Sequence, residues 1–323
     1  MIDAHAHLSN TDYGNVDIYL RQLKEAGVDQ GIVVPGGMMD VRKMTDYVVG
    51  KTKPENPVPD NDYVLKCCRE NQEVLKGFLC VDPHAEDALK TLEKGYRDGF
   101  KGLKLNPMTH QFSFSSKAML DIVSACASYG FPVYSHVLFS PGASTIKFVA
   151  LAKQFPKANF ILGHMGFGPA DQDGLEAAAA LNNFYLETST GNFLHLKEAV
   201  RRAGPGKLIY GSEFPLSHPK AELEKILLLK LTGEAQDKIL GKNIQHLLSL
   251  EGAPSSAPVQ RKPIQATSTP EPSPAPVKNP QPESSYGIGA TLISSHAAAA
   301  SKPSKNKPVP GPWVPNKGGR VKE

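Results

Sequence analysis

The chain has 323 residues, four cysteines and a formal net charge of +4. This length suits one large domain or two ordinary ones, and the longest purely aliphatic run, residues 226–229, is far below the roughly 20 residues that span a bilayer. Residues 252–323 contain nine basic and three acidic residues, so the rest of the chain has a net charge of −2 and gives no electrostatic reason to expect nucleic-acid binding.

The first predicted element is a β-strand over residues 2–8, with the sequence Ile-Asp-Ala-His-Ala-His-Leu. Side chains alternate along a strand, so His5 and His7 are expected on one face together with Asp3. Two imidazoles on one face of a rigid strand are half of a metal site, and the alternative is a pair of ordinary histidines. Because this strand follows Met1 directly, we expect no signal peptide.

Strand-like and helical segments then alternate along the chain. Apolar runs predict further strands at residues 31–35, 77–83, 101–107, 132–136, 159–164, 184–188 and 207–213. Apolar periodicity predicts helices at residues 16–26, 60–71, 84–96, 116–129, 143–154, 169–181, 194–203, 220–231 and about 240–248. The glycine- and proline-rich segment 35–58 has only a weak helical pattern and is a candidate lid.

Eight strand–helix units in roughly 250 residues predict an α/β fold, a (β/α)₈ TIM barrel spanning residues 1–251. A doubly wound open sheet is the alternative. That fold normally has a glycine-rich phosphate loop after its first strand, and this chain has His-Leu-Ser-Asn there.

The composition changes beyond the predicted barrel. Residues 252–323 hold 14 of the 27 prolines together with many Ser, Ala and Lys residues, and apolar periodicity disappears. Such a segment cannot bury enough surface to offset the entropy of ordering, which predicts a disordered tail. Trp313, the only tryptophan, lies among prolines and is either a docking element for a protein partner or part of a solvated tail.

The four cysteines show no Cys-x-x-Cys spacing. This pattern indicates buried thiols in a reducing compartment, rather than disulfides or a zinc knuckle. We therefore expect a cytoplasmic protein without a membrane partner.

Several chemically active side chains lie where predicted strands end. His136 and His164 end the fifth and sixth strands, Glu213 ends the eighth, and Lys104 lies near the end of the fourth. In a (β/α)₈ barrel these ends form one rim, which carries the active site. Together with His5, these residues predict a single site at that rim, and the alternative of isolated core histidines is disfavoured.

At this point the sequence resembles a known family, the amidohydrolase superfamily. The resemblance covers residues 1–250 and rests on Asp3–His7, on the motif Gly-Phe-Lys-Gly-Leu-Lys-Leu at 99–105, on His136 and His164, on Tyr-Gly-Ser-Glu-Phe-Pro at 210–215 and on 238–244. Within the superfamily the chain is most similar to the amidohydrolase-related branch that includes aminocarboxymuconate-semialdehyde decarboxylase.

The resemblance implies a role for each of these positions. His5, His7 and His136 would bind one divalent metal ion, and His164 would stand near it and assist catalysis. The family acid of the eighth strand, an aspartate in Gly-Ser-Asp, binds or neighbours the metal, but here it is Glu213. The extra methylene shifts the metal, makes the carboxylate act through a water, or signals a changed activity, because active sites hold positions to about half an ångström.

Three imidazoles and a carboxylate favour zinc, with manganese or iron as alternatives. Such an ion lowers the pKa of a bound water to roughly 7. Glu213 is then the expected general base and a further ligand, and His164 the expected stabiliser of the oxyanion. The alternative for His164 is a supporting or core histidine.

Three residues are candidate substrate contacts. Lys104 would bind a substrate carboxylate; the alternatives are a structural pair with Glu187 and, least favoured, a carbamylated lysine bridging two metals. His110 and His218 lie in loops after the fourth and eighth strands, where substrate contacts belong, although a histidine in such a place is more often a surface residue.

The function favoured by these features is a metal-dependent hydrolase. A metal-bound hydroxide would attack a carbonyl of a small amide, lactone or ester. Two alternatives stay open: non-oxidative decarboxylation of a small unsaturated or aromatic acid, and a non-catalytic barrel that recruits a partner through its tail. The sequence does not decide the oligomeric state, and a homo-oligomer is compatible with it.

Overall fold

The computed structural model describes residues 1–249, so the predicted disorder of 252–323 lies outside the described residues. Nine parallel strand segments form the centre of the fold: β1 (Ile2–Leu8), β2 (Gln30–Pro35), β3 (Leu75–Gly77), β4 (Leu79–Cys80), β5 (Leu103–Leu105), β6 (Val133–Ser135), β7 (Phe160–Leu162), β8 (Phe184–Glu187) and β9 (Leu208–Ile209). Ladder pairing groups them as β1-β2-β3 and as β4-β5-β6-β7-β8-β9.

Individual backbone hydrogen bonds join these two groups into a closed ring. The amide of Phe78, the single residue between β3 and β4, donates to Val33 O at 3.0 Å. On the other side, Ala4 N donates to Tyr210 O at 3.0 Å and His7 N donates to Phe214 O at 2.7 Å. The segments β3 and β4 are therefore one strand interrupted at Phe78, and the eight resulting strands confirm the predicted (β/α)₈ barrel.

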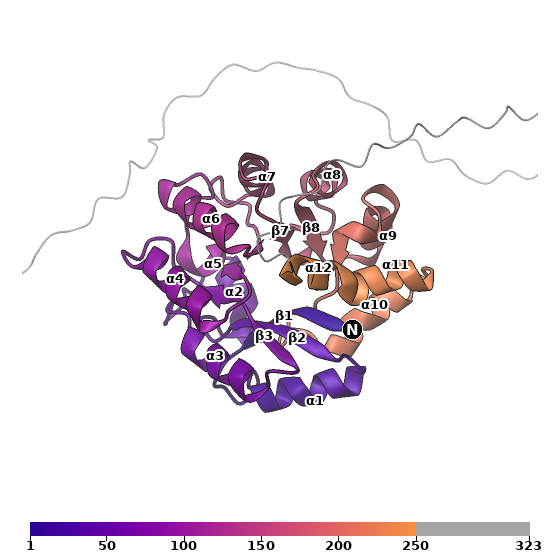
Figure 1. Cartoon of the computed structure of the whole chain (residues 1–323), viewed down its shortest axis with the longest axis horizontal. Coiled ribbons are helices and arrows are strands. Elements are labelled where there is room, and N and C mark those ends of the chain that lie inside the picture. The colour runs from indigo at the N-terminus through magenta and orange to yellow at the C-terminus, as the bar shows by residue number, and fades with distance from the viewer. Residues whose placement is uncertain (250–323) are drawn as a thin grey trace, which may run out of the picture. The chain divides into compact units, whose positions relative to one another are not determined.

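Helices surround the ring, as Figure 1 shows. The longer ones are α1 (Val16–Ala26), α3 (Asn61–Glu70), α4 (Ala88–Asp98), α6 (Lys117–Tyr129), α7 (Thr145–Gln154), α8 (Gln172–Ala180), α9 (Phe193–Arg202) and α10 (Pro219–Leu227). Shorter ones are α2 (Met44–Val48), α5 (Pro107–His110), α11 (Gly233–Asp237) and α12 (Asn243–Ser249). Side-chain caps fix several starts; Asn15 accepts from Ile18 N before α1, and Ser116 accepts from Met119 N before α6.

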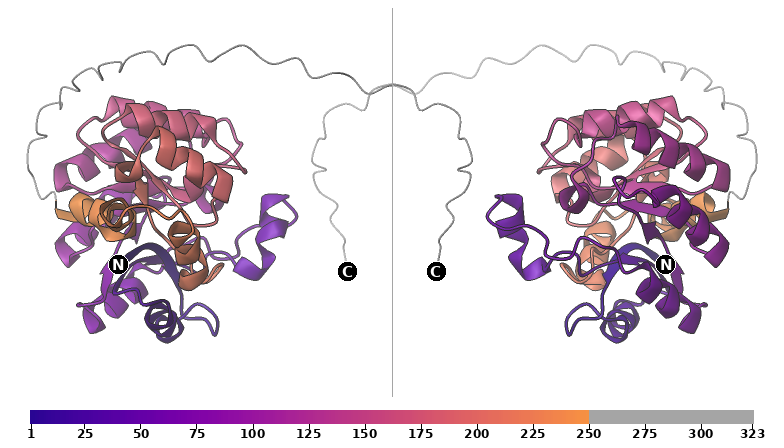
Figure 2. Two further views of the ribbon diagram at one scale, coloured as in Figure 1. Left: turned by 90° about the vertical axis from the view of Figure 1, so that its right-hand side faces the viewer. Right: turned by 90° about the vertical axis from the view of Figure 1, so that its left-hand side faces the viewer.

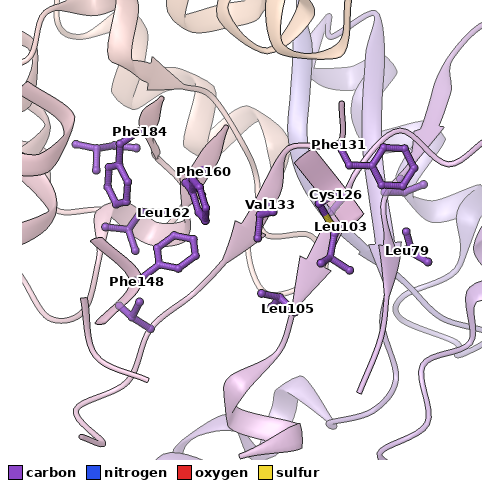
Figure 3. Close-up of a cluster of buried hydrophobic side chains, with 14 of the residues drawn as sticks. Leu79, Leu103, Leu105, Cys126, Phe131, Val133, Phe148, Phe160, Leu162 and Phe184 are labelled. Atoms are coloured by element: carbon purple, nitrogen blue, oxygen red, sulfur yellow. The ribbon is translucent and has the colours of Figure 1, made fainter. Parts of the chain in front are cut away.

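Two buried clusters hold the barrel together. One lies between the strands and the helices, and Figure 3 shows the part in which Phe148, Phe160 and Phe184 meet. The other fills the inside of the barrel, where Ile244 and Leu247 of α12 join residues from the strands. Helix α12 therefore closes one end of the barrel, and Figure 2 shows it opposite the segment that contains α2.

The first strand departs from the predicted alternation. Its register with β2 moves from Asp3↔Gly31 to Ala6↔Val33, so β1 holds one extra residue, a β-bulge. Asp3 accepts from Tyr19 Oη of α1 at 2.9 Å, whereas Ala4 belongs to the inner cluster. The expectation that Asp3 shares a face with the two histidines is therefore wrong, because the bulge breaks the two-residue period between them.

Two expectations from composition can be compared with residues 1–249. No helix in this range is both long enough and apolar enough to cross a membrane. The four cysteine thiols are unpaired; three are buried and Cys68 is half-buried.

Candidate metal centre

Side chains from the first, sixth and last strands meet at the mouth of the barrel. His5 Nε2 lies 3.0 Å from His7 Nε2. Glu213 lies beside both rings, with Oε2 at 2.8 Å from His5 Nδ1 and Oε1 at 3.6 Å from His7 Nε2. His164 Nε2 lies 3.8 Å from Glu213 Oε2. The structure thus brings together four of the residues predicted for the site.

The backbone turns sharply where two of these side chains leave their strands. His164 and Glu213 both have left-handed φ angles, 59° and 58°, which are costly for residues with a Cβ. Hydrogen bonds hold the conformation: His164 N donates to Glu187 Oε2 at 3.2 Å, and Glu213 N donates to His5 O at 2.8 Å. The sharp turns aim both side chains across the mouth.

Each of three imidazoles has an oxygen partner at Nδ1. His7 Nδ1 lies 3.3 Å from Pro35 O, His5 Nδ1 lies 2.6 Å from Tyr134 Oη, and His164 Nδ1 lies 3.0 Å from Ser189 Oγ. A histidine that binds a metal through one nitrogen usually donates from the other to such an oxygen. Two tetrahedral zinc ligands at the usual bond length of 2.0–2.1 Å are about 3.3 Å apart, close to the His5–His7 separation.

His136 directly follows β6, and its ring is near that of His164. Its Nε2 is buried without a hydrogen-bond partner, and its ring centroid lies 6.3 Å from that of His164. Glu213 Oε2 is likewise buried without a well-aligned hydrogen bond. Buried polar atoms without partners are costly, and a cation between them would satisfy an imidazole lone pair and a carboxylate oxygen at once. The donor set of nitrogen and carboxylate oxygen therefore fits a divalent metal ion.

Electrostatics at the centre favour an ionised Glu213 beside a neutral His7. Burial by itself would raise the pKa of Glu213, but the nearby rings of His5, His7 and His164 outweigh it and hold that pKa well below its usual range. Burial lowers the pKa of His7 to about 3. For His5, the carboxylate of Glu213 outweighs burial and raises the pKa. A cation at this centre would be attracted by the ionised Glu213, and it would compete with a proton for the His5 ring.

Lys104 lies within the barrel beside this group. Its Nζ is buried, has no hydrogen-bond partner, and lies 4.1 Å from the centroid of the Tyr134 ring. Burial lowers its pKa to about 8. Among the ion pairs of residues 1–249, none joins Lys104 to Glu187. The ammonium is thus a buried cation without a counter-ion in contact.

The two other predicted substrate contacts are engaged elsewhere. His110 is buried in α5, and its Nε2 lies 2.9 Å from Pro57 O, which ties that helix to the end of the predicted lid. His218 caps α10 by accepting from Lys220 N, and its Nε2 lies 3.5 Å from Glu25 Oε2 on α1. The structure does not bring either ring to the histidine cluster.

A small pocket opens beside the centre, between the barrel mouth and the segment that begins at Gly36. His7, Glu213 and Asn106 line one side, and Met38, Met39, Met44, Val41, Tyr13 and Pro35 line the other. Its volume of about 40 Å³ holds roughly three water molecules, since one water needs 10–15 Å³. Ligand pockets are typically about 300–1,000 Å³, so this one is far smaller than a pocket for a small organic molecule.

Sequence reasoning missed Glu187 as a site residue. It ends β8, is fully buried, and accepts from Tyr134 Oη at 2.6 Å and from Ser189 Oγ at 2.9 Å. Burial by itself would raise its pKa, but the nearby rings of His5 and His164 and the hydrogen bond from Tyr134 outweigh it and lower the pKa to about 2. The available signal was an acid at the end of an otherwise apolar strand, as at Glu213.

Comparisons with known proteins add the following. A family model described as amidohydrolase matches residues 2–250, and no curated protein sequence matches the chain. The chain is similar in structure to a TIM-barrel protein from Bordetella bronchiseptica, with a TM-score of 0.62 and 15% identity over 78% of this chain and 99% of that one. It is also similar to a manganese-bound dihydroxybenzoic acid decarboxylase from Polaromonas, with a TM-score of 0.59 and 16% identity over 78% and 97% of the two chains. A third neighbour, a probable 2-pyrone-4,6-dicarboxylic acid hydrolase from Acinetobacter baumannii, has a TM-score of 0.57 and 17% identity over 76% and 98% of the two chains.

Proposed function

The chain belongs to the amidohydrolase family, and from this premise we propose that it is a metal-dependent hydrolase that cleaves a small amide, lactone or ester. The observation that carries the proposal is the convergence of His5 Nε2, His7 Nε2 and the Glu213 carboxylate at the barrel mouth. Imidazole and carboxylate ligands that leave a coordination position open are typical of catalytic metal sites.

We assign His5, His7, His136 and Glu213 as the residues that hold one divalent ion. Zinc suits this donor set, and manganese is the alternative, supported by its presence in the Polaromonas decarboxylase. When bound, such an ion polarises a carbonyl and lowers the pKa of a coordinated water to roughly 7.

The chain's own residues supply the proton transfers. Glu213 is ionised in this setting and accepts the proton of the attacking water. His164 Nε2 lies 3.8 Å from Glu213 Oε2, where its lone pair can take the proton from that carboxylate. The resulting imidazolium can then hold the developing oxyanion and pass the proton to the leaving group. Glutamate in place of the family aspartate keeps this carboxylate in contact with His5 despite its left-handed backbone.

Of the three predicted substrate contacts, we retain Lys104. Its unpartnered ammonium suits a carboxylate group on the substrate, and the methionine-lined wall of the pocket suits an apolar ring or chain. The proposed substrate is thus a small carbonyl compound with one carboxylate and an apolar body.

Decarboxylation of a small aromatic acid is the second candidate. It is favoured by the same buried ammonium, which would hold the carboxylate that leaves, and by structural neighbours that are decarboxylases of dihydroxybenzoate and carboxyvanillate. The two reactions differ in product, because only decarboxylation releases carbon dioxide.

The test is metal-loaded full-length protein incubated with 2-pyrone-4,6-dicarboxylate, 2,6-dihydroxybenzoate and a panel of carboxylated lactones and amides. Hydrolysis without carbon dioxide release is expected, and it should disappear in His5→Ala/His7→Ala. Carbon dioxide release would establish the second candidate. A protein that binds no divalent metal and converts none of these compounds would refute both and favour the non-catalytic alternative.

A further inference from the structure

One buried carboxylate lies behind two of the four histidines. Glu187 Oε2 accepts from Tyr134 Oη at 2.6 Å and from Ser189 Oγ at 2.9 Å, and Glu187 Oε1 accepts from Ser189 N at 2.6 Å. The two hydroxyls lead to different rings: Tyr134 Oη to His5 Nδ1, and Ser189 Oγ to His164 Nδ1. Glu187 is thus connected to both histidines through one hydroxyl each.

The direction of these hydrogen bonds determines the protonation of the rings. An ionised carboxylate only accepts, so Tyr134 and Ser189 must donate their single hydroxyl protons to Glu187. Each hydroxyl oxygen can then only accept from the histidine it faces. His5 and His164 must therefore carry their ring proton on Nδ1, which leaves the lone pair of Nε2 free.

The second neighbour of His5 is consistent with this assignment. Glu213 Oε2 also lies 2.8 Å from His5 Nδ1 but is not aligned for a hydrogen bond, so the Tyr134 hydroxyl is the hydrogen-bond partner of that nitrogen. His5 Nε2 faces His7 Nε2, where a metal ion would sit. The free lone pair therefore points to the place where the proposed function needs it.

Glu187 itself is placed behind the rings rather than at the ion. Oε2 already accepts from Tyr134, from Ser189 and from the backbone of His164, and Oε1 faces Gly211, where an added Cβ would overlap it. An added Cβ at Gly163 would likewise lie 2.6 Å from Tyr134 Oη. Two glycines thus leave the room that the carboxylate and the phenol occupy.

We propose that Glu187 is a positioning residue, which through Tyr134 and Ser189 holds the ring protons of His5 and His164 on Nδ1. Nε2 of His5 then faces the divalent cation, and Nε2 of His164 is free to accept a proton. The ligand is a divalent metal ion, and in this respect the inference rests on the proposed function. The role requires a carboxylate. The backbone N–H of Ser189, 2.6 Å from Oε1, would hold the oxygen of a glutamine at that position and turn its NH₂ group toward both hydroxyls. The hydroxyls would then donate to the rings instead of accepting from them.

The variants Glu187→Gln, Tyr134→Phe and Ser189→Ala test this proposal in the full-length, metal-free protein. The matched control is Thr190→Ala, because Thr190 Oγ1 also lies near His164 Nδ1, at 3.3 Å, and among the hydrogen bonds of residues 1–249 none joins it to Glu187. Long-range ¹H–¹⁵N NMR of the rings, at a pH where they are neutral, reports each tautomer. Titration with Mn²⁺ reports affinity, and circular dichroism reports folding.

We expect Nδ1–H on both rings of the unaltered protein. Tyr134→Phe should change the tautomer of His5 alone, and Ser189→Ala should change the tautomer of His164 alone. Thr190→Ala should change neither tautomer. Glu187→Gln should change both tautomers and weaken Mn²⁺ binding by about 10–100-fold, the range for partners that orient metal ligands.

Unaltered tautomers and Mn²⁺ affinity in Glu187→Gln would overturn the proposal, as would equal effects of Ser189→Ala and Thr190→Ala on His164. If Glu187→Gln does not fold, the two hydroxyl variants decide. An unaltered protein that binds no Mn²⁺ or Zn²⁺ would refute the proposed function, while the tautomer pattern would still decide the role of Glu187.

Discussion

Lys104 Nζ lies 4.1 Å from the centroid of the Tyr134 ring, in the interior of the barrel. The ring face attracts the ammonium, but it does not replace the water that a lysine has at the surface. This burial lowers the pKa of Lys104 to about 8. Lys104 therefore makes the folded protein less stable, and the substrate-binding role proposed for it would account for its presence there.

Replacing Lys104 by methionine should stabilise the protein while weakening substrate binding. The folded protein loses the lysine proton near pH 8 and the unfolded chain near 10.5, a difference worth about 3 kcal/mol. Between these values the unfolded state binds more protons, so the lysine makes the free energy of unfolding rise with pH. Urea unfolding at pH 7 and pH 10 should show Lys104→Met more stable at pH 7, with a smaller advantage at pH 10. A constant difference would contradict the assignment.

For an anionic substrate, Lys104→Met should raise KM more than it lowers kcat, because a charge that only holds the substrate contributes equally to ground and transition states. In the unaltered protein KM should rise above pH 8, and this rise should be absent from the variant. Initial rates measured between pH 6.5 and 9.5 give KM and kcat of the two proteins at each pH.

Shortening Glu213 tests its two roles. Glu213→Ala should weaken metal binding without abolishing it, because three imidazoles remain, and should lower kcat by 10²–10⁴-fold through loss of the base. Glu213→Asp should retain more metal than the alanine variant. Metal analysis of dialysed protein gives the metal content, and single-substrate kinetics give kcat. Full activity in Glu213→Ala would show that another group takes the proton.

Gly211→Ala should displace Glu187 and His5 and so disturb the candidate metal centre. An added Cβ there overlaps the Glu187 carboxylate and lies 3.0 Å from the Cβ of His5, whereas an added Cβ at Gly206 meets nothing within 4 Å. Overpacking of this kind costs about 1–3 kcal/mol. Thermal unfolding and Mn²⁺ titration should therefore both change in Gly211→Ala, and Gly206→Ala should match the unaltered protein in both.

Removing residues 252–323 should leave melting temperature and metal content unchanged. The eight strands of the ring, the surrounding helices and both buried clusters lie within residues 1–249. Differential scanning calorimetry and metal analysis of the two proteins measure the effect. A fall in either value would show that the removed segment contributes to the fold or to the centre.

The sequence predicted the barrel because local signals repeat eight times and a strand buried on both faces is apolar throughout. His164 and Glu213 could be assigned to the mouth from their places at strand ends. The family resemblance was confirmed by the match over residues 2–250. The candidate roles of these residues stay predictions until metal binding is measured.

Other features depend on contacts that no local pattern carries. The bulge in β1 breaks the alternation on which the placement of Asp3 relied. Tyr134 touches His5 across 129 positions of sequence, so its link to Glu187 is visible only in three dimensions. His218 follows a strand end as a substrate contact would, yet its ring caps α10, because a residue's place in a loop does not determine the direction of its side chain.

Helix α12 limits where a small molecule could enter and leave the barrel. Ile244 and Leu247 occupy the end at which the strands begin, with at most 1% of either residue exposed, so a small molecule cannot pass through the barrel from end to end. In the proposed reaction, substrate and product would both use the opening beside the methionines. A product that keeps the substrate's carboxylate would bind the same unliganded centre, so it should inhibit competitively with substrate.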